Sequence, residues 1–336
     1  MIMKRTTLLL IIMCLASTTL WARLGGAGLN FLIVNAGSRP SALGGAYAAL
    51  ANDLDAIYFN PAGISALNRF SLNFSYTPYF ADMSYQSMAM AIPSGMFGTI
   101  GLSLLSLQSG DIEKTTLDEP NGTNSSYSAS DYAFGVTLAR PLTDKFSVGG
   151  TMKFITEGID EVSCFGWAID LGATYNTGFK NFRLGFSILN FGPDMQFKGD
   201  VLKFHYKPVD PNDPEENDLM EEDAQAQWES EKIPLPLMFQ FGLAVDLIQT
   251  SAYRVTFTAD KVNPTDQVET FAVGMEVGYL EFLNLRVGYS DKNDGNFAAG
   301  AGIILPMGNS KAIFDYAFRN HQYLDALHTF ALTLVF

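Results

Sequence analysis

The side chains most often used in catalysis and metal binding are scarce in this sequence and lie far apart. Three histidines and two cysteines are present: His205, His321, His328, Cys14 and Cys164. None of them has the spacing of a metal-ligand pair. The stretch from Gly185 to Leu189 departs from the GxSxG nucleophile pattern at its last position. The sequence therefore predicts no catalytic residue, no metal ligand and no cofactor, and we expect that the protein is not an enzyme.

The densest group of potential ligands is the stretch 208–231, which contains ten carboxylates and no Lys or Arg. Carboxylates suit Ca²⁺, but prolines stand where further ligands would be needed and no glycine forms the turn. A solvated loop and a surface that receives a basic partner protein are the other interpretations. Residues Leu219 to Trp228 could form a helix. The sequence leaves open whether this loop binds a protein, calcium or nothing.

Ten more charged residues lie in segments where apolar and polar positions alternate, and each of them occupies a polar position. They are Lys153, Asp170, Arg183, Asp246, Arg254, Asp260, Glu276, Arg286, Asp315 and Arg319. A single Arg or Lys facing mid-bilayer hydrocarbon costs about 2–4 kcal/mol. Ten charges on one parity therefore indicate a wet or mutually paired interior. We favour pairing with one another and with an interior segment over a dedicated ligand site.

The elements that carry these charges are strands, because apolar residues recur at every second position. Fourteen segments show this period: 70–77, 83–92, 98–107, 131–140, 146–156, 164–175, 182–191, 236–247, 253–261, 269–278, 282–290, 296–304, 311–319 and 327–336. Most approach the roughly ten residues that cross a bilayer at a tilt. The fold class predicted is all-β, a 14-stranded antiparallel transmembrane barrel.

The connections between these segments support the same count. Every second connection is short, whereas the two long ones, 108–130 and 192–235, fall on the other side. Long outer loops and short inner turns are typical of outer-membrane barrels. Large apolar residues such as Phe241, Met275 and Trp167 should face lipid, with small or polar neighbours facing inward. The net charge of −14 argues against a nucleic-acid partner.

The last strand ends on Phe336. This ending resembles the terminal strand of bacterial outer-membrane barrels, whose final Phe is read by the barrel insertion machinery. The resemblance implies that Phe336 is an insertion signal and lies at the periplasmic rim. It also implies that bacterial outer-membrane lipid surrounds the barrel residues 70–336, and that the protein is located in the cell outer membrane.

The amino-terminal residues differ from the rest. Residues 1–22 have the charged start and apolar core of a signal peptide. Residues 23–69 lack the period of two. A helix capped by Ser41 is expected to run to Leu50. Ala and Gly dominate this stretch, so the helix should be thin. Short helices are also expected at 55–59 and 64–67. We expect 23–69 to form a small helical plug, or hatch, inside the barrel. A separate periplasmic cap is the alternative.

Two motifs in this segment resemble the amino-terminal signature of the PorV/PorQ family. The first contains Gly44 and Gly45 within Arg39 to Asp53, and the second is Asn60-Pro61-Ala62-Gly63. That family is related to FadL-like long-chain fatty acid transporters, which share an Asn-Pro-Ala element in their hatch. The motif resemblance extends over about residues 28–107.

The resemblance to PorV implies a partner or shuttle protein for type IX secretion, with secreted cargo proteins and secretion components as partners. The resemblance to FadL implies instead a passive transporter of hydrophobic small molecules. The acidic loop favours the first function, and the small, charged inner face disfavours a continuous apolar tunnel. A barrel with a purely structural role is the third alternative.

Overall fold

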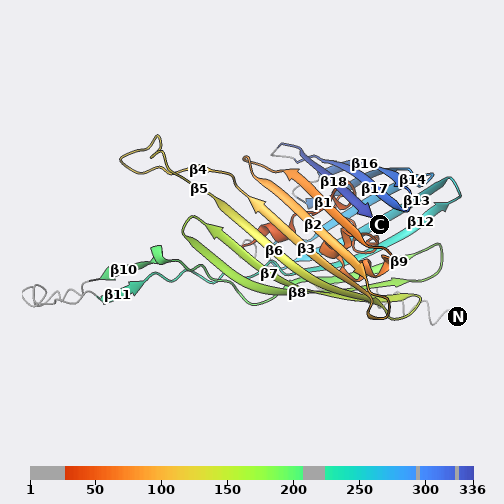
Figure 1. The fold of residues 1–336 in the computed structure, drawn as a ribbon, viewed down its shortest axis with the longest axis horizontal. Helices are drawn as coiled ribbons and strands as arrows, with labels where there is room; N and C mark the ends of the chain where they lie inside the picture. The colour runs from red at the N-terminus through yellow and green to blue at the C-terminus, as the bar shows by residue number, and fades with distance from the viewer. Residues whose placement is uncertain (1–26, 207–223, 293–295, 322–324) are drawn as a thin grey trace, which may run out of the picture.

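The computed structural model describes residues 27–206, 224–292, 296–321 and 325–336. Fourteen antiparallel strands close into one barrel (Figure 1). The strands are β1 (Ser71–Pro78), β2 (Ser84–Pro93), β3 (Thr99–Gln108), β6 (Ala129–Pro141), β7 (Phe146–Ile159), β8 (Val162–Asn176), β9 (Arg183–Phe191), β12 (Met238–Gln249), β13 (Tyr253–Pro264), β14 (Thr270–Tyr279), β15 (Leu283–Ser290), β16 (Asn296–Met307), β17 (Ser310–Arg319) and β18 (Leu327–Val335).

The predicted fold class is confirmed. The number of barrel strands agrees, and the strand ends differ from the predicted ends by at most three residues. The first and last strands close the sheet, with Ser71 opposite Val335 and Tyr76 opposite Phe330. The Phe336 N–H extends this seam by donating to the Phe70 carbonyl at 2.9 Å. Closure leaves no barrel strand with an unpaired edge.

The two ends of the barrel differ. The connections 94–98, 142–145, 177–182, 250–252, 280–282 and 308–309 lie at the end where β1 begins and β18 finishes, here called the short-turn end. The opposite, long-loop end carries the two long connections, which contain small hairpins of their own. Figure 1 shows both hairpins extending beyond the barrel on the side away from the carboxyl terminus.

These hairpins pair β4 (Ile112–Glu113) with β5 (Ser126–Tyr127) and β10 (Lys203–Tyr206) with β11 (Ala224–Gln227). A short helix, η4 (Asp200–Leu202), precedes β10. The predicted helix over Leu219 to Trp228 is wrong for the part that the structure describes, because Ala224 to Gln227 form a strand on β10. Cross-strand pairing of the two loop ends decides that conformation, and it is not visible in local composition. Most of the acidic stretch lies outside the described residues.

Burial alternates along the barrel strands with the predicted parity. In β14, Phe271 and Met275 are 52% and 39% exposed, whereas Ala272 and Glu276 are each 2% exposed. The same alternation places large apolar side chains on the outside in every barrel strand, including Phe134, Trp167, Phe314 and Phe330. A soluble monomer rarely exposes so continuous an apolar surface. Hydrocarbon around the outer face and polar groups within is the arrangement of a membrane-spanning barrel.

The amino-terminal segment contains only short helices: η1 (Asn30–Ile33), α2 (Ser38–Ala42), α3 (Ala56–Phe59) and η2 (Pro61–Ala66). A further single turn, η3 (Gly95–Phe97), lies between β2 and β3. Within the described part of the chain, no helix combines the length and the apolar character needed to span a membrane. The predicted signal peptide lies outside the described residues.

The outward parity can be tested at Met275, whose cross-strand neighbours Phe257 and Val287 are also apolar. In phospholipid vesicles we expect Met275→Arg to lower the free energy of unfolding by about 2–4 kcal/mol, the cost of a charge near mid-bilayer. Leu142→Arg is the control, because Leu142 is exposed in a short turn outside the strands. Urea titration of both variants gives the comparison, and equal tolerance of the two would contradict the assignment.

Candidate functional site: the interior of the barrel

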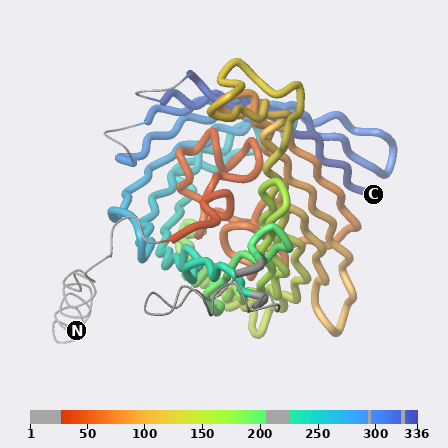
Figure 2. The backbone as a smooth tube through the Cα atoms, turned by 90° about the vertical axis from the view of Figure 1, so that its left-hand side faces the viewer, coloured from red at the N-terminus to blue at the C-terminus, as the bar shows by residue number. Residues whose placement is uncertain are grey.

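The amino-terminal segment, residues 27–69, lies inside the barrel. Viewed from the long-loop end, its chain winds through the ring of strands (Figure 2). Helix α2 packs on β15 to β18, and η2 packs on β6 to β8. Most of its residues from Ala36 to Ile64 are buried. Its many Ala and Gly residues keep it thin, so that it fits within the sheet.

The predicted helix from Ser41 to Leu50 is wrong. Helix α2 spans Ser38–Ala42, and the backbone then turns at Gly44 and Gly45, whose φ values are +68° and +90°. Glycine adopts these left-handed conformations readily, so the pair ends the helix. Beyond it, the N–H groups of Tyr47 and Ala48 donate to the Asp260 carboxylate at 2.7 and 2.6 Å. The barrel wall thus supplies partners that a longer helix would have supplied itself.

The barrel wall also forms hydrogen bonds with backbone groups of the segment at other places. Thr258 donates to the Ala46 carbonyl at 3.1 Å, and Ser187 to the Phe59 carbonyl at 2.7 Å. The Ser38 hydroxyl donates in the other direction, to the Thr329 carbonyl of β18 at 3.1 Å. Buried backbone groups must be paired. Single polar side chains on the inner face therefore account for the path of the segment.

The Asn-Pro-Ala-Gly motif forms one of these junctions. The Asn60 amide donates to the Ala48 carbonyl at 2.8 Å and to the Ala173 carbonyl of β8 at 3.1 Å, and its oxygen accepts from the Ala62 N–H. Pro61 begins η2, where its missing N–H is not needed. Asn60 and Ala62 are fully buried, and Gly63 is buried as well. The motif thus links two parts of the segment to the wall.

The wall carries glycines where the segment backbone passes close to it. A side chain at Gly288 would overlap the backbone of Leu43 and Gly44, and one at Gly185 would overlap that of Ala48. Gly149, Gly172, Gly242 and Gly274 also face the segment in this way. The inner surface is therefore shaped to the segment as well as bonded to it.

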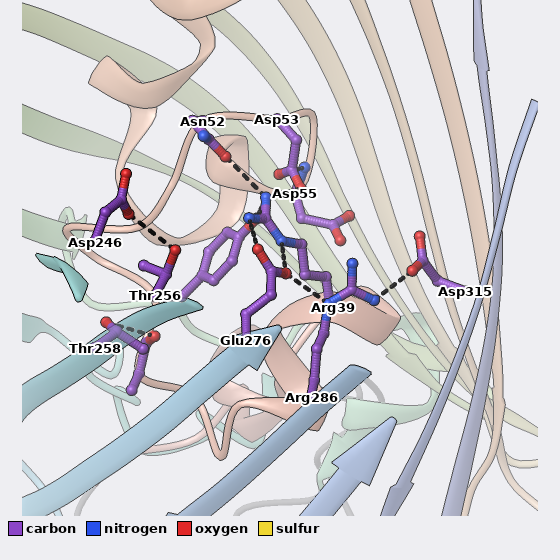
Figure 3. A network of polar contacts seen from close by, with 12 residues as sticks. Arg39, Asn52, Asp53, Asp55, Asp246, Thr256, Thr258, Glu276, Arg286 and Asp315 are labelled. Carbon is purple, nitrogen blue, oxygen red and sulfur yellow. Dashed lines mark hydrogen bonds and ion pairs between the residues drawn. The ribbon is translucent and has the colours of Figure 1, made fainter. Parts of the chain in front are cut away.

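Arg39 is the centre of a buried ion-pair network between the segment and the wall (Figure 3). Its guanidinium makes a two-point contact with Glu276 of β14, with both N–O distances at 2.8 Å. It also donates to Asn52 and Asp53 at 2.8 Å and to Tyr47 at 3.0 Å. Glu276 accepts in turn from Arg286 at 2.7 Å, and Arg286 contacts Asp315. Charges of alternating sign thus connect one segment with three strands.

Asp55 lies beside this network and has no basic partner of its own. It is 4% exposed, and its Oδ1 atom has no hydrogen-bond partner. Burial raises the pKa of Asp55 well above its ordinary value, and the neighbouring Asp53 and Asp315 carboxylates raise it further, against the opposing effect of Arg39 and Arg286. A proton on Asp55 therefore fits this arrangement better than a charge.

The remaining charges predicted to face inward fall into separate groups. Lys153 pairs with Asp170 at 2.7 Å and donates to Asn190 at 2.8 Å. Arg183 pairs with Asp246 at 3.1 Å. Arg254 and Arg319 line cavities, and neither forms an ion pair with the other eight predicted charges. Phe336 lies at the short-turn end, 51% exposed beside the Phe70 ring.

Sequence reasoning missed the roles of Arg39, Asp53 and Asp55. A signal was present, since Arg39 is the only basic residue between positions 24 and 68. A lone Arg in a segment expected inside a barrel predicts a carboxylate partner on the wall. Its partner Glu276 was assigned to the inner face, but the sequence could not pair two residues 237 positions apart.

Three cavities surround the segment. A cavity of about 330 Å³ lies toward the long-loop end, where Tyr79, Gln267, Lys292 and His321 border it. We call it the long-loop cavity. Two hollows of about 170 and 570 Å³ lie toward the short-turn end. Gly44, Gly45 and Tyr58 face the first cavity, while Asp53 and Asp55 face the 170 Å³ hollow. The segment therefore stands between spaces that open toward opposite ends.

The described residues contain no cluster of three or more His, Cys, Asp or Glu side chains arranged to hold a metal ion. Cys164 is buried and unpaired on β8. The polar groups inside the barrel are instead arranged as ion pairs and backbone contacts. Binding a solute and holding the segment in place are the chemistry that this interior can perform.

Two family models match the chain. The uncharacterised protein family UPF0164 matches residues 23–154, and a family of unknown function, DUF5723, matches residues 156–311. Neither description names PorV or PorQ, so that resemblance stays a prediction. No curated protein matches the chain.

Solved structures of channels and transporters resemble this barrel. The CymD monoaromatic hydrocarbon channel matches with a TM-score of 0.57 at 12% identity, over 90% of this chain and 97% of that one. The Pseudomonas putida toluene transporter TodX gives 0.51 at 12%, over 88% and 95%. A Pseudomonas aeruginosa FadL homologue gives 0.51 at 10%, over 90% and 98%. At these identities the likeness shows the fold alone.

The buried network should be worth much more than a surface ion pair. Glu276→Ala leaves Arg39 and Arg286 facing each other without their shared carboxylate, and we expect a loss of about 3–5 kcal/mol in the free energy of unfolding. Lys114→Ala is the control, because its pair with Asp160 is largely exposed and should contribute nothing measurable. Denaturant titration in vesicles measures both. Similar losses in the two variants would contradict the network's role.

The raised pKa of Asp55 predicts a pH effect. A carboxyl whose pKa is higher in the folded state than in the unfolded state favours folding when protonated, so its contribution is lost as the pH rises above about 4. Between pH 5 and pH 8 we expect the melting temperature of the wild type to fall more than that of Asp55→Asn. Asp118→Asn, at an exposed loop carboxylate, should behave like the wild type. Parallel curves for wild type and Asp55→Asn would refute the assignment.

Proposed function

We propose that the protein is an outer-membrane barrel through which small molecules pass, with the amino-terminal segment as a plug that closes the lumen. The observation that carries this proposal is the long-loop cavity, a space of about 330 Å³ lined by residues of the amino-terminal segment and of the barrel wall. Its volume is within the range of small-molecule sites. The resemblance to solved channels and transporters, rather than to enzymes, supports a transport role.

The outer surface of the barrel supports a location in the outer membrane. Aromatic residues such as Tyr253, Tyr279 and Phe282 are exposed near the short-turn end, and Tyr132, Tyr289 and Tyr316 near the long-loop end. Aromatic girdles at both interfaces, with aliphatic residues between them, are typical of barrels in lipid. Phe336, exposed at the short-turn end, is well placed for recognition by barrel insertion machinery. We infer that the short-turn end faces the periplasm and the long-loop end faces the outside of the cell.

Passage through the lumen requires part of the segment to move. Ion pairs and hydrogen bonds hold the segment in place. When the segment shifts, the polar groups that form these contacts can form hydrogen bonds with water instead. Breaking one member of a buried ion pair is costly, whereas separating both members into water costs much less. The Arg39 network is therefore suited to hold a plug that can be displaced, and the hollows toward the short-turn end supply space for the movement.

A second function is favoured by the long loops. Both hairpins extend beyond the barrel, and side chains in this region such as Leu117, Val201 and Trp228 are largely exposed. Exposed apolar residues on projecting loops are suited to bind another protein. This feature fits the PorV-type alternative, in which secreted cargo proteins and secretion components dock on the long-loop end. The acidic stretch 208–231 would then meet a basic partner surface.

Shortening the loops separates the two functions. We would replace residues 110–128 and 196–232 by short turns, which leaves all fourteen barrel strands intact. Small-molecule passage in proteoliposomes should survive this deletion if transport is the function. Co-purification of secreted proteins from detergent-solubilised outer membranes should be lost if docking is the function. Wild-type protein that captures secretion components and passes no solute would overturn the transport proposal.

Weakening the plug's attachment should increase passage. Arg39→Ala removes the contacts to Glu276, Asn52 and Asp53 at once, and we expect single-channel conductance in planar bilayers to rise severalfold over the wild type. The Lys114→Ala variant should match the wild type, because Lys114 lies on an outer loop. Circular dichroism confirms that Arg39→Ala keeps its barrel. An intact Arg39→Ala barrel with unchanged conductance would mean that the segment does not control passage.

A further inference from the structure

The charges that line the long-loop cavity are all basic. The chain as a whole is acidic, with 35 Asp and Glu against 21 Lys and Arg. Yet the charged or ionisable side chains around this cavity, apart from two tyrosines, are Lys153, Lys292, Arg319 and His321, and no described Asp or Glu borders it. Clefts lined by one sign of charge concentrate ions of the opposite sign. The composition of the cavity thus differs from that of the molecule around it.

Three of these groups have no ion-pair partner in the part of the chain that the structure describes. Lys153 is neutralised by Asp170 at 2.7 Å. For Lys292, Arg319 and His321, no carboxylate among the described residues lies within the 4.0 Å ion-pair limit. All three side chains are partly buried. Burial and the neighbouring Arg319 and Lys292 charges lower the pKa of His321, so the cations here are Lys292 and Arg319. Charges withdrawn from water without a counter-charge are unfavourable, so an anion placed between these two would relieve their repulsion.

The three groups come from the long-loop ends of β15 and β17, which β16 separates in the barrel wall. Arg319 ends β17, and His321 follows two residues later. Lys292 follows β15 by two residues. Burial and, to a smaller extent, the charge of Arg319 lower the pKa of Lys292 to about 8, and Asp266 partly opposes this lowering. Lys292 therefore keeps most of its charge at neutral pH, and Arg319 is the cation that acts upon it.

The uncharged part of the lining is also polar in large part. It includes the side chains of Asn30, Asn35, Gln240, Gln267, Thr270 and Ser290. A pure hydrocarbon in this space would cover amides and hydroxyls without offering them hydrogen bonds, which is unfavourable. A solute that carries oxygen atoms would satisfy them. The CymD and TodX monoaromatic hydrocarbon channels share this fold, but this lining is not suited to a hydrocarbon ligand.

We propose that the long-loop cavity binds a small polar anion, with Arg319 and Lys292 holding its anionic group and the surrounding amides and hydroxyls holding its polar body. The inference rests on the proposed transport function and names the class of solute. Carboxylates and phosphates share the required chemistry, because both accept charge-assisted hydrogen bonds from Arg and Lys. A site of this kind lets a protein of negative net charge bind anions, because the attraction comes from the cavity itself.

Binding can be measured by isothermal titration calorimetry on the full chain in detergent micelles. The probes are glycerol 3-phosphate, citrate, glycerol, toluene and dodecanoate. We expect glycerol 3-phosphate or citrate to bind, and glycerol and toluene to give no measurable heat. The Lys292→Gln/Arg319→Gln double variant should bind the polar anion at least tenfold more weakly. Lys292→Arg should retain most of the affinity, because it keeps the charge.

Lys198→Gln is the matched control, since it removes one positive charge from an exposed site at the same end of the barrel. Its affinity should equal that of the wild type. The inference is overturned if glycerol or toluene binds as tightly as the anions, or if dodecanoate binds and the polar anions do not. Unchanged affinity in a folded double variant overturns it as well.

Flux in proteoliposomes distinguishes this inference from the proposed function. Anion binding without passage of any solute supports the site and overturns the transport role. Passage of glycerol at the same rate as glycerol 3-phosphate supports transport and overturns the anion site. Faster passage of the anion, lost in the double variant and kept in Lys198→Gln, supports both.

Discussion

The structure depends on one closed sheet that separates membrane hydrocarbon on its outer face from polar groups on its inner face. Because hydrocarbon covers the outer face, a charge in the middle of a strand must point inward, and an inward charge is unfavourable unless it has a partner in the narrow lumen. Neighbouring strands supply some partners, as Arg286 does for Glu276. The interior segment supplies others, as Arg39 does for the same carboxylate. The plug-like path of the segment and the polarity of the lumen are two results of one constraint.

The barrel could be predicted because its signal is local. A period of two survives in each strand whatever its neighbours are, and the turn chemistry marks the ends, so the predicted ends are within three residues. The interior could be predicted only in kind. The charges that face inward could be identified by parity. Whether Asp260 binds a basic side chain or two backbone N–H groups depends on the amino-terminal segment, which is more than two hundred residues away in the sequence.

The errors have the same origin. Ala-rich residues 41–50 favour a helix locally, yet Gly44 and Gly45 end it and the wall carboxylate of Asp260 takes the free N–H groups. Residues 224–227 lack the composition of a strand, yet they pair with β10 across a long connection. In both cases tertiary partners outweigh propensities worth a few tenths of a kcal/mol per residue. The sequence did not reveal which cations line the long-loop cavity for a similar reason. Parity predicts that a charge faces inward, but it does not predict which inward charges form ion pairs.

The closure of the barrel between its first and last strands has a consequence for assembly. The segment inside directly precedes β1, and β1 forms hydrogen bonds to β18, the last strand of the barrel in chain order. Once that seam has formed, the wall is continuous, and glycines such as Gly288 and Gly185 already fit the backbone of the chain within. The amino-terminal residues must therefore enter the lumen while the carboxyl-terminal strand is still free. The order in which the strands pair therefore decides whether the amino-terminal segment lies inside the finished barrel.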